Sequence, residues 1–241
     1  MIIYPAIDIR NGKCVRLVQG KAENETIYGE DPVEIAKMWE NAGASFLHVV
    51  DLDGAFEGDA GNKDIIKKIA GNSSIPIQVG GGIRTMERIE EYLEFPQIAR
   101  VIIGTAAITN PDLLSRALSK YGKKIAVGID AINGKVAIQG WVKSTEIDAV
   151  SFGKHLKDIG VDTVIYTDIS RDGMLSGPNL QYTKKLIAQS GLDVIASGGI
   201  SSIDDVINIK RIGAAGAIIG KALYTGNIEL KEVLTTMEEV K

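Results

Sequence analysis

The sequence predicts a closed (β/α)8 barrel, and three observations support this α/β fold class. Eight short apolar runs alternate with eight longer amphipathic segments, without a break in composition along the 241 residues. The apolar runs are continuous rather than alternating, as a parallel sheet buried on both faces requires. Several motifs of the first half recur in the same order in the second half. We therefore expect a single-domain TIM barrel with an internal half-barrel duplication.

The elements follow one another as β-then-α units. We expect strands at 2–8, 46–51, 75–80, 100–104, 124–130, 163–168, 193–197 and 215–220. We expect helices near 32–43, 62–70, 85–94, 110–120, 147–159, 178–190, 202–212 and 228–239. Prolines at or near three helix starts support these boundaries, because the missing N–H costs nothing there. Pro5 cannot donate to a ladder, so we expect a bulge or a frayed start in the first strand. A doubly wound open sheet is the alternative to closure.

The motif repeats indicate two half-barrels related by duplication. The matched pairs are AIDIRNGKC at 6–14 with IDAINGKV at 129–136, HVVDLDG at 48–54 with IYTDISRDG at 165–173, GGI at 81–83 with GGI at 198–200, and IIG at 102–104 with IIG at 218–220. We place the halves at approximately 1–122 and 123–241. In a closed barrel the first and fifth strands face each other, so the repeated aspartate becomes a pair.

Composition excludes several classes of function. Apolar residues make up 45% and charged residues 24% of the chain, as in soluble globular proteins. A net charge of −4 with scattered Lys and Arg argues against nucleic acid as a partner. Cys14, His48 and His155 are too few for a disulfide or a zinc site, and we expect no metal. The apolar runs are shorter than the ~20 residues of a membrane span. The N-terminal run meets Asp8 too early for a secretory signal, so we expect a cytoplasmic protein.

Asp8 and Asp130 are the candidate proton carriers. Both follow facing strands, and side chains at the carboxyl ends of barrel strands gather around one mouth. Two carboxylates flanking a small substrate suit proton abstraction on one side and donation on the other. The alternative is that each aspartate only accepts N–H groups of its own Asn-Gly turn. The symmetric placement favours chemistry.

Glycine-rich strand ends predict two phosphate sites. Backbone without Cβ atoms can approach a ligand closely, and N–H groups at the next helix start bind anions. The alternative is that the glycines only serve tight turns. No GxGxxG or Walker spacing is present, which argues against NAD and ATP, and we expect no cofactor. The ligand would thus be elongated, with a phosphate at each end. The candidates are Gly81, Gly82, Gly104 and Thr105 in the first half, and Gly198, Gly199, Gly220 and Lys221 in the second.

The whole chain resembles one family, the phosphoribosylformimino-5-aminoimidazole carboxamide ribotide isomerases of histidine biosynthesis. The motifs that carry the resemblance are PAIDIRNGKCVRLVQG (5–20), HVVDLDGA (48–55), QVGGGIR (78–84), VIIGTAA (101–107), QGW (139–141), YTDISRDGML (166–175), ASGGISS (196–202) and AIIGKALY (217–224). The resemblance implies an Amadori rearrangement, in which a ribosylamine ring opens and an aldose becomes a ketose without metal or redox cofactor. It also implies a small-molecule substrate with two phosphates.

The resemblance assigns roles to single residues. Asp8 matches the family's general base and Asp130 the residue usually named as proton donor. Asp172 matches another carboxylate with a claim to the acid role, and we rank Asp130 first. The remaining matches are Thr167, a supporting hydroxyl beside the ribose, and Arg16 and Trp141, which contact the ligand from mobile loops.

Other polar residues receive structural roles. We expect His48 to be packed or hydrogen-bonded within its strand, His155 to lie on the surface, and Cys14 to be filler in the hairpin after Asp8. We expect Asp51 and Asp168 to bind neighbouring loops or to orient Arg16. The loops at 20–30, 140–147 and 170–177 are expected to close over the substrate.

Three other functions stay open at this point. The sister cyclase subunit of imidazole glycerol phosphate synthase has the same paired aspartates, but there we expect a cysteine where Ala6 stands here. A dual isomerase would also accept phosphoribosyl anthranilate. A non-catalytic phosphate-binding sensor would keep the glycines without needing the aspartates. We expect the protein to be a monomer.

Overall fold

Parallel strands close into a barrel in the computed structural model of the chain, which describes residues 1–58 and 61–239. The barrel strands, in spatial order, are β1 (Ile2–Arg10), β4 (Leu47–Asp51), β5 (Ile77–Gly80), β6 (Ile98–Ile103), β7 (Ile125–Ile132), β10 (Thr163–Asp168), β11 (Asp193–Ser197) and β12 (Gly216–Ile219). Strand β10 pairs with both β11 and β7, and β12 pairs with β1, so the sheet has no open edge between its halves. The predicted barrel is confirmed, and the open sheet is wrong.

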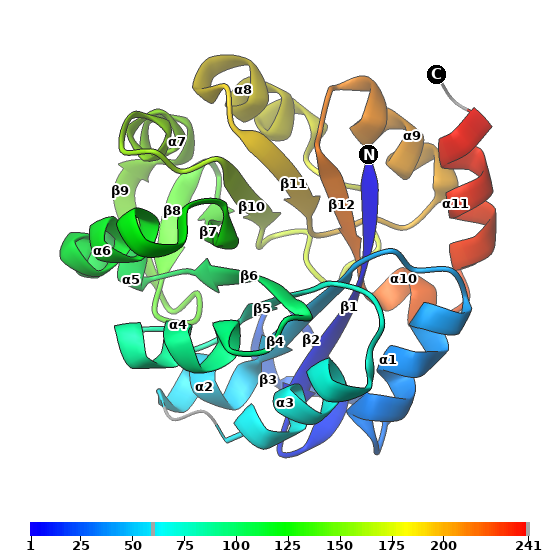
Figure 1. The fold of residues 1–241 in the computed structure, drawn as a ribbon. Helices are drawn as coiled ribbons and strands as arrows, with labels where there is room; N and C mark the ends of the chain where they lie inside the picture. Colours follow the sequence, from blue (N-terminus) through cyan, green and yellow to red (C-terminus); the bar gives the residue numbers. More distant parts are fainter. Residues whose placement is uncertain (59–60, 240–241) are drawn as a thin grey trace.

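Helices surround the barrel, as Figure 1 shows. The predicted helices form as α1 (Pro32–Asn41), α3 (Lys63–Asn72), α4 (Met86–Leu93), α6 (Pro111–Tyr121), α7 (Ala149–Asp158), α8 (Leu180–Ser190), α9 (Ile203–Arg211) and α11 (Leu230–Glu239). Local sequence sets several starts: Asp31 and Asn110 cap α1 and α6 just before proline, and Ser202 forms a capping box at α9. Among the described residues no helix has the length and apolar character that crossing a membrane would demand.

The barrel interior and the helix layer form separate apolar clusters. Alternate residues of each strand point inward, so Tyr4, Ala6, Ala126 and Ile165 pack together inside the barrel. The residues between them, such as Ile7, face the helices and join the larger outer cluster. By the same alternation Asp8 and Asp130 point inward, above the packed interior. The fold therefore fixes both carboxylates at the barrel mouth.

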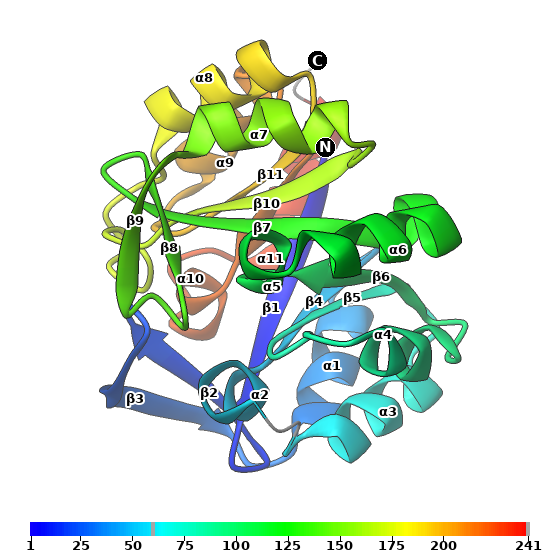
Figure 2. The ribbon, with the colours of Figure 1, turned by 90° about the vertical axis from the view of Figure 1, so that its left-hand side faces the viewer.

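Two β-hairpins extend the barrel, and the sequence analysis did not define them as strands. Strands β2 (Lys13–Val18) and β3 (Lys21–Gly29) follow β1, and β8 (Lys135–Ile138) and β9 (Lys143–Asp148) follow β7. The Asn-Gly turns at 11–12 and 133–134 have positive φ at both residues, as two-residue hairpin turns require. Figure 2 shows both hairpins on the same side of the molecule, beyond the carboxyl ends of the barrel strands. The expected loops at 20–30 and 140–147 are thus largely strands, which corrects that prediction.

Short helices also follow barrel strands that were expected to end in loops. These are α2 (Leu52–Glu57), α5 (Ala106–Thr109) and α10 (Lys221–Tyr224), and a 3-10 turn, η1 (Gly122–Lys124), precedes β7. The helices α5 and α10 begin at equivalent places, directly after the Gly104-Thr105 and Gly220 segments. They are too short to show helical periodicity in the sequence.

Strand β1 runs without a register shift through Pro5, so the expected bulge or frayed start is wrong. The Ile2 N–H bonds the carbonyl of Ala215 on the β12 side, and donors alternate along a strand. The nitrogen of Pro5 therefore faces the β4 side, where pairing begins only at Ala6 and His48. No ladder donor is needed at that position.

The two halves repeat in detail that the motif comparison did not include. Asp51 at the end of β4 accepts from Asn62 Nδ2 at 2.7 Å, and Asp168 at the end of β10 accepts from Asn179 Nδ2 at 2.5 Å. Each asparagine precedes a helix, α3 or α8. The spacing between aspartate and asparagine is the same in both halves. The half-barrel boundaries themselves stay a prediction.

Candidate active site

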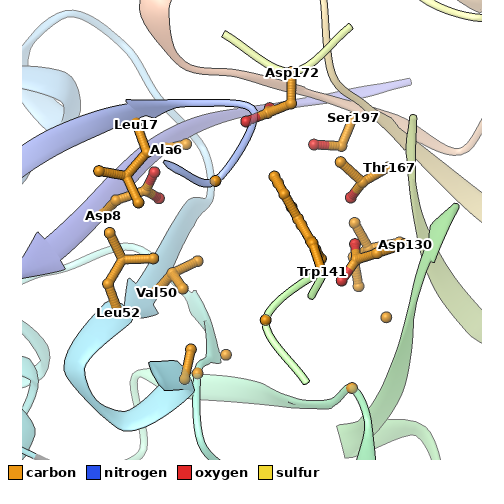
Figure 3. A pocket seen from close by; sticks show the side chains of 18 of the residues that line it. Ala6, Asp8, Leu17, Val50, Leu52, Asp130, Trp141, Thr167, Asp172 and Ser197 are labelled. Atoms are coloured by element: carbon orange, nitrogen blue, oxygen red, sulfur yellow. The ribbon is translucent and has the colours of Figure 1, made fainter. Parts of the chain in front are cut away.

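A cavity of about 260 Å³ lies at the carboxyl ends of the barrel strands. Figure 3 shows Asp8 on one side, Asp130 and Thr167 on the other, and the ring of Trp141 between the two sides. Asp8 and Asp130 belong to β1 and β7, which stand opposite each other with three barrel strands between them on either side. The wall includes every candidate from the sequence: Asp8, Arg16, Gly81, Gly82, Gly104, Thr105, Asp130, Trp141, Thr167, Asp172, Gly198, Gly199, Gly220 and Lys221.

Asp8 forms an ion pair with Arg16. Arg16 Nη1 donates to Asp8 Oδ2 at 2.6 Å, and the two side chains are 13% and 16% exposed. Burial raises the pKa of Asp8, and the Arg16 charge and hydrogen bond oppose that rise. Arg16 lies on β2 rather than on a mobile loop, which corrects the expectation from the resemblance.

The alternative role for Asp8, as an acceptor within its own turn, is not what the described residues show. In the Asn-Gly turn after β1, Asn11 N donates to Asp53 Oδ2 and Gly12 N donates to Asn62 Oδ1. Other side chains therefore satisfy the turn. The Asp8 carboxylate is left facing the cavity with Arg16 as its partner.

Asp130 lies on the opposite wall with different partners. Burial raises the pKa of Asp130, and hydrogen bonds from Trp141 and Thr167 oppose that rise. Thr167 is the neighbour of Asp130 in the β7–β10 register and is 6% exposed. Donors that bind the ionised carboxylate favour its charged form.

Asp172 is the third carboxyl on the cavity wall, and its pKa is also raised. It lies in the loop after β10, whose backbone is tied by turns such as Asp172 N to Ile169 O. The pKa of Asp172 is raised to about 7: burial is the largest cause, the Arg16 charge opposes the rise, and the charges of Asp8 and Asp130 add to it. A carboxyl with this pKa carries its proton in part of the molecules at neutral pH and can donate it.

The two hairpins and the loop at 170–177 meet over the cavity. Gln19 N, at the β2–β3 turn, donates to Asp172 O at 3.1 Å. A Cβ on Gly20 of that turn would collide with the ring of Trp141, so the hairpin tips pack directly on each other. Gln139 N, at the β8–β9 turn, donates to Thr105 Oγ1 at 2.9 Å. These contacts hold Trp141 between the two sides of the cavity.

The glycines after β5 and β11 are required by packing around the mouth. Gly81 and Gly82 have φ of +101° and +67°, and a side chain on either would collide with the backbone of Asp51 or Gly54. Gly198 and Gly199 repeat this arrangement in the second half. These four positions therefore need glycine for their tight turns, which was the alternative to phosphate binding. The same four glycines also lie on the cavity wall.

Gly104 and Gly220 differ from those four. A Cβ on Gly104 would meet nothing within 4 Å, so packing does not demand glycine there. A Cβ on Gly220 would collide with the Arg16 guanidinium, so this glycine makes room for the arginine. Lys221 Nζ donates to Gly173 O at 2.9 Å and thereby binds the loop that carries Asp172.

The structural roles expected for the other polar residues are mostly confirmed. His48 is buried, and its Nδ1 lies 3.0 Å from Gln78 Nε2. Asp51 binds Asn62, Asp168 binds Asn179, and neither carboxylate has a hydrogen bond to Arg16 among the described residues. His155 is exposed and Cys14 is buried.

His48 also lines the cavity, and the sequence analysis missed this. Gln78 Nε2 donates to Nδ1 and Gln78 Oε1 accepts from Arg100, so the arrangement fits a neutral ring with its proton on Nε2. Burial and the Arg16 charge lower the pKa of His48 to about 3. His48 lies two residues after Phe46, so both side chains point into the barrel. This alternation could have indicated the position of His48 from the sequence.

No grouping of three or more His, Cys, Asp or Glu side chains that could hold a metal ion occurs within residues 1–58 and 61–239. The polar groups on the cavity wall include carboxylates, two guanidinium groups, hydroxyls, an ammonium group, an imidazole and backbone amides. This set can move protons and bind anions.

Comparison with known proteins gives consistent similarities over the full chain. The profile of the family described as histidine biosynthesis protein matches residues 2–229. A protein from Ruminiclostridium cellulolyticum is 54% identical over 234 residues, covering 97% of this chain and 99% of its own length. Proteins from Acetivibrio thermocellus and Thermoanaerobacter pseudethanolicus are each 51% identical over 234 residues, covering 97% of this chain and 98% of each relative. All three are named 1-(5-phosphoribosyl)-5-((5-phosphoribosylamino)methylideneamino)imidazole-4-carboxamide isomerase.

Proposed function

The chain belongs to the histidine biosynthesis protein family, and from this premise we propose that it is the aldose–ketose isomerase for which its relatives are named. The reaction is an Amadori rearrangement of the N-linked phosphoribosyl group to its phosphoribulosyl form. The observation that carries the proposal is the placement of Asp8 and Asp130 on facing strands, with Asp172 above the same cavity.

Asp8 acts as the general base. After the ribose ring opens to a Schiff base, the Asp8 carboxylate takes the proton from C2′, and the electron pair moves to give the enolamine. The ion pair with Arg16 supports this role because it favours the ionised carboxylate that burial disfavours. The enolamine then takes a proton at C1′ and loses the proton of its C2′ hydroxyl, which leaves the C2′ carbonyl of the ketose.

Asp172 is the better general acid in this chain, with Asp130 in support. Ring opening needs a proton on the ring oxygen as the C1′–O bond breaks, so the donor must carry one near neutral pH. The raised pKa of Asp172, about 7, meets this need. Burial also raises the pKa of Asp130, but hydrogen bonds from Trp141 and Thr167 favour its charged form and oppose that rise. We therefore reverse the ranking that the resemblance suggested.

The two phosphates bind at equivalent ends of the cavity. One would occupy the wall formed by Gly81, Gly82, Gly104 and Thr105, and the other the wall formed by Gly198, Gly199, Gly220 and Lys221. Trp141 would stack on the aminoimidazole from the β8–β9 turn. The open space beside Gly104 supports the first site, and the Lys221 ammonium supports the second.

Turnover by the purified protein tests the proposal. The unaltered protein, without added metal or nucleotide, should isomerise the bisphosphorylated substrate, and Asp8→Asn should lose turnover while keeping most of its binding. Asp112→Asn, an exposed carboxylate at the start of α6, is the matched control and should behave as the unaltered protein. Absence of turnover by the folded, unaltered protein would end the proposal. Full ligand response without any loss in Asp8→Asn would indicate a sensor instead.

The same assay separates the remaining functions. The names of the relatives favour the isomerase over the sister cyclase. Phosphoribosyl anthranilate, offered as a second substrate, tests for a dual isomerase. We also propose that the enzyme works in the cytoplasm, as a monomer and without nucleic acid. Light scattering tests the monomer, for which it should give a mass of 25.8 kDa.

A further inference from the structure

A backbone carbonyl on strand β1 helps to position the ion pair between Arg16 and Asp8. Arg16 Nη1 donates to Asp8, and Nη2 donates to Ala6 O at 2.7 Å. Arg16 Nε is buried and has no partner among the described residues. The guanidinium therefore has two anchors, and both lie on strand β1. Its orientation depends on the position of the Ala6 carbonyl.

Tyr224 binds the same carbonyl. The Tyr224 hydroxyl, at the end of α10, donates to Ala6 O at 2.8 Å, so this oxygen accepts from both Tyr224 and Arg16. The Arg16 guanidinium carbon also lies 5.5 Å from the centre of the Tyr224 ring. Gly220, four residues earlier, leaves the space that the guanidinium occupies. The segment from Gly220 to Tyr224 thus forms a slot for Arg16.

The hydroxyl of Tyr224 is fixed by buried groups outside the cavity wall. Trp39 Nε1 donates to it at 3.4 Å, and Cys14 Sγ lies 3.2 Å from it. The rings of Trp39 and Tyr28 contact the Tyr224 ring, with centres 5.3 and 4.9 Å away. Helix α1 and strand β2 therefore contact the hydroxyl of Tyr224, and strand β3 contacts its ring. These contacts give a structural role to the tyrosine that ends the AIIGKALY motif. They also give the Cys14 thiol a hydrogen-bond partner, the Tyr224 hydroxyl.

We propose that Tyr224 is a positioning residue that, through the Ala6 carbonyl and its own ring, fixes the Arg16 guanidinium against Asp8 and so sets the proton affinity of the base. The inference rests on the proposed role of Asp8 in the isomerase. Tyr224 does not line the cavity, and it acts only through Arg16.

The charged groups around Asp8 give the direction of the effect. Arg16 lowers the pKa of Asp8, and the Asp172 and Cys14 groups also face this pair. His48, on the neighbouring strand, stays neutral because its pKa is lowered to about 3. Burial raises the pKa of Tyr224 well above 10, so the hydroxyl stays a neutral donor during the assay. Loosening Arg16 should therefore move the Asp8 titration to higher pH.

Tyr224→Phe removes the hydroxyl and keeps the ring, and Tyr28→Phe is the matched control on the adjacent ring. Carbon NMR of the substrate-free protein should show Asp8 titrating about 0.5–1 pH unit higher in Tyr224→Phe. The acidic limb of kcat/KM should move by the same amount, and kcat should fall about 10-fold with KM within about 2-fold. Tyr28→Phe should leave the titration and both constants unchanged. An Asp8 titration in Tyr224→Phe equal to that of the unaltered protein would overturn the inference.

A double-mutant cycle separates positioning from a general structural effect. In an Arg16→Ala background, Tyr224→Phe should cause no further shift or loss, because the group it positions is absent. Equal losses in both backgrounds would overturn the inference. If Tyr224→Phe does not fold, Trp39→Phe removes the indole donor to the same hydroxyl; a shift in the same direction supports the inference and an unchanged titration contradicts it. The NMR titration needs no turnover, so failure of the proposed function and failure of this inference give different results.

Discussion

Replacing Asp172 by asparagine should stabilise the protein while reducing its activity. The folded structure raises the pKa of Asp172 from the ordinary value of 3.8 to about 7. A raised folded-state pKa means that the folded state binds a proton more tightly than the unfolded chain. The stability that this proton provides is fully present below about pH 4 and is lost as the pH rises to about 7. Above that pH the buried charge destabilises the fold, and Asp172→Asn avoids it.

The size of the effect follows from the two pKa values. The full shift of roughly three units corresponds to about 4 kcal/mol between the ends of the window. Between pH 5.5 and pH 8.5, the contribution of the Asp172 proton to the free energy of unfolding should fall by about 2 kcal/mol, because the rest of the change occurs below pH 5.5. The stability of Asp172→Asn relative to the unaltered protein should therefore rise by about 2 kcal/mol between these pH values.

Urea unfolding at pH 5.5 and pH 8.5 measures this difference directly. Both proteins are compared at each pH, so that other titrating groups cancel. Asp112→Asn, whose carboxylate is exposed, should show no such change and serves as the control. An advantage of Asp172→Asn that is equal at the two pH values would refute the account of Asp172 as a buried proton donor.

Four further outcomes follow from the structure. The kcat/KM profile should rise on the acidic side as Asp8 ionises and fall through about pH 7 as Asp172 loses its proton. In Asp130→Asn, the Asp172 titration, measured by carbon NMR, should move to lower pH because one charge that raises the pKa of Asp172 is gone. Gly82→Ala should destabilise the protein by about 1–3 kcal/mol in urea unfolding because its Cβ would collide with Gly54, while Gly71→Ala in α3, which meets nothing within 4 Å, should be neutral or stabilising. Limited proteolysis at 139–142 should slow when a bisphosphorylated substrate analogue is added, and equal cleavage with and without the analogue would count against closure over the substrate.

The barrel could be predicted because its signals are local and repeated. Continuous apolar runs such as 100–104 identify buried strands, and the Asp31-Pro32 and Asn110-Pro111 pairs identify helix starts. The facing position of Asp8 and Asp130 followed from strand order alone. The hairpins were only partly recognised, because the exposed strand β3 has mixed polarity, and the Asn-Gly turns were treated as ends of strands rather than as two-residue hairpin turns.

The electrostatics of the site could not be read from sequence spacing. Asp172 owes its raised pKa to burial and to the charges of Asp8 on β1 and Asp130 on β7, which only the folded chain brings together. The missing side chain of Gly220 also leaves room for the Arg16 guanidinium, a role that the motif did not indicate. Tyr224 and Ala6 are 218 positions apart and are joined by one hydrogen bond. Such contacts depend on barrel closure, which places β12 next to β1.

Loss of deuterium from C2′ of labelled substrate tests the base most directly, because it reads the proton abstraction itself. The unaltered protein should release the deuterium during turnover, and Asp8→Asn should bind the substrate and leave the deuterium in place. Release by folded Asp8→Asn at the rate of the unaltered protein would contradict the central claim that this carboxylate takes the C2′ proton.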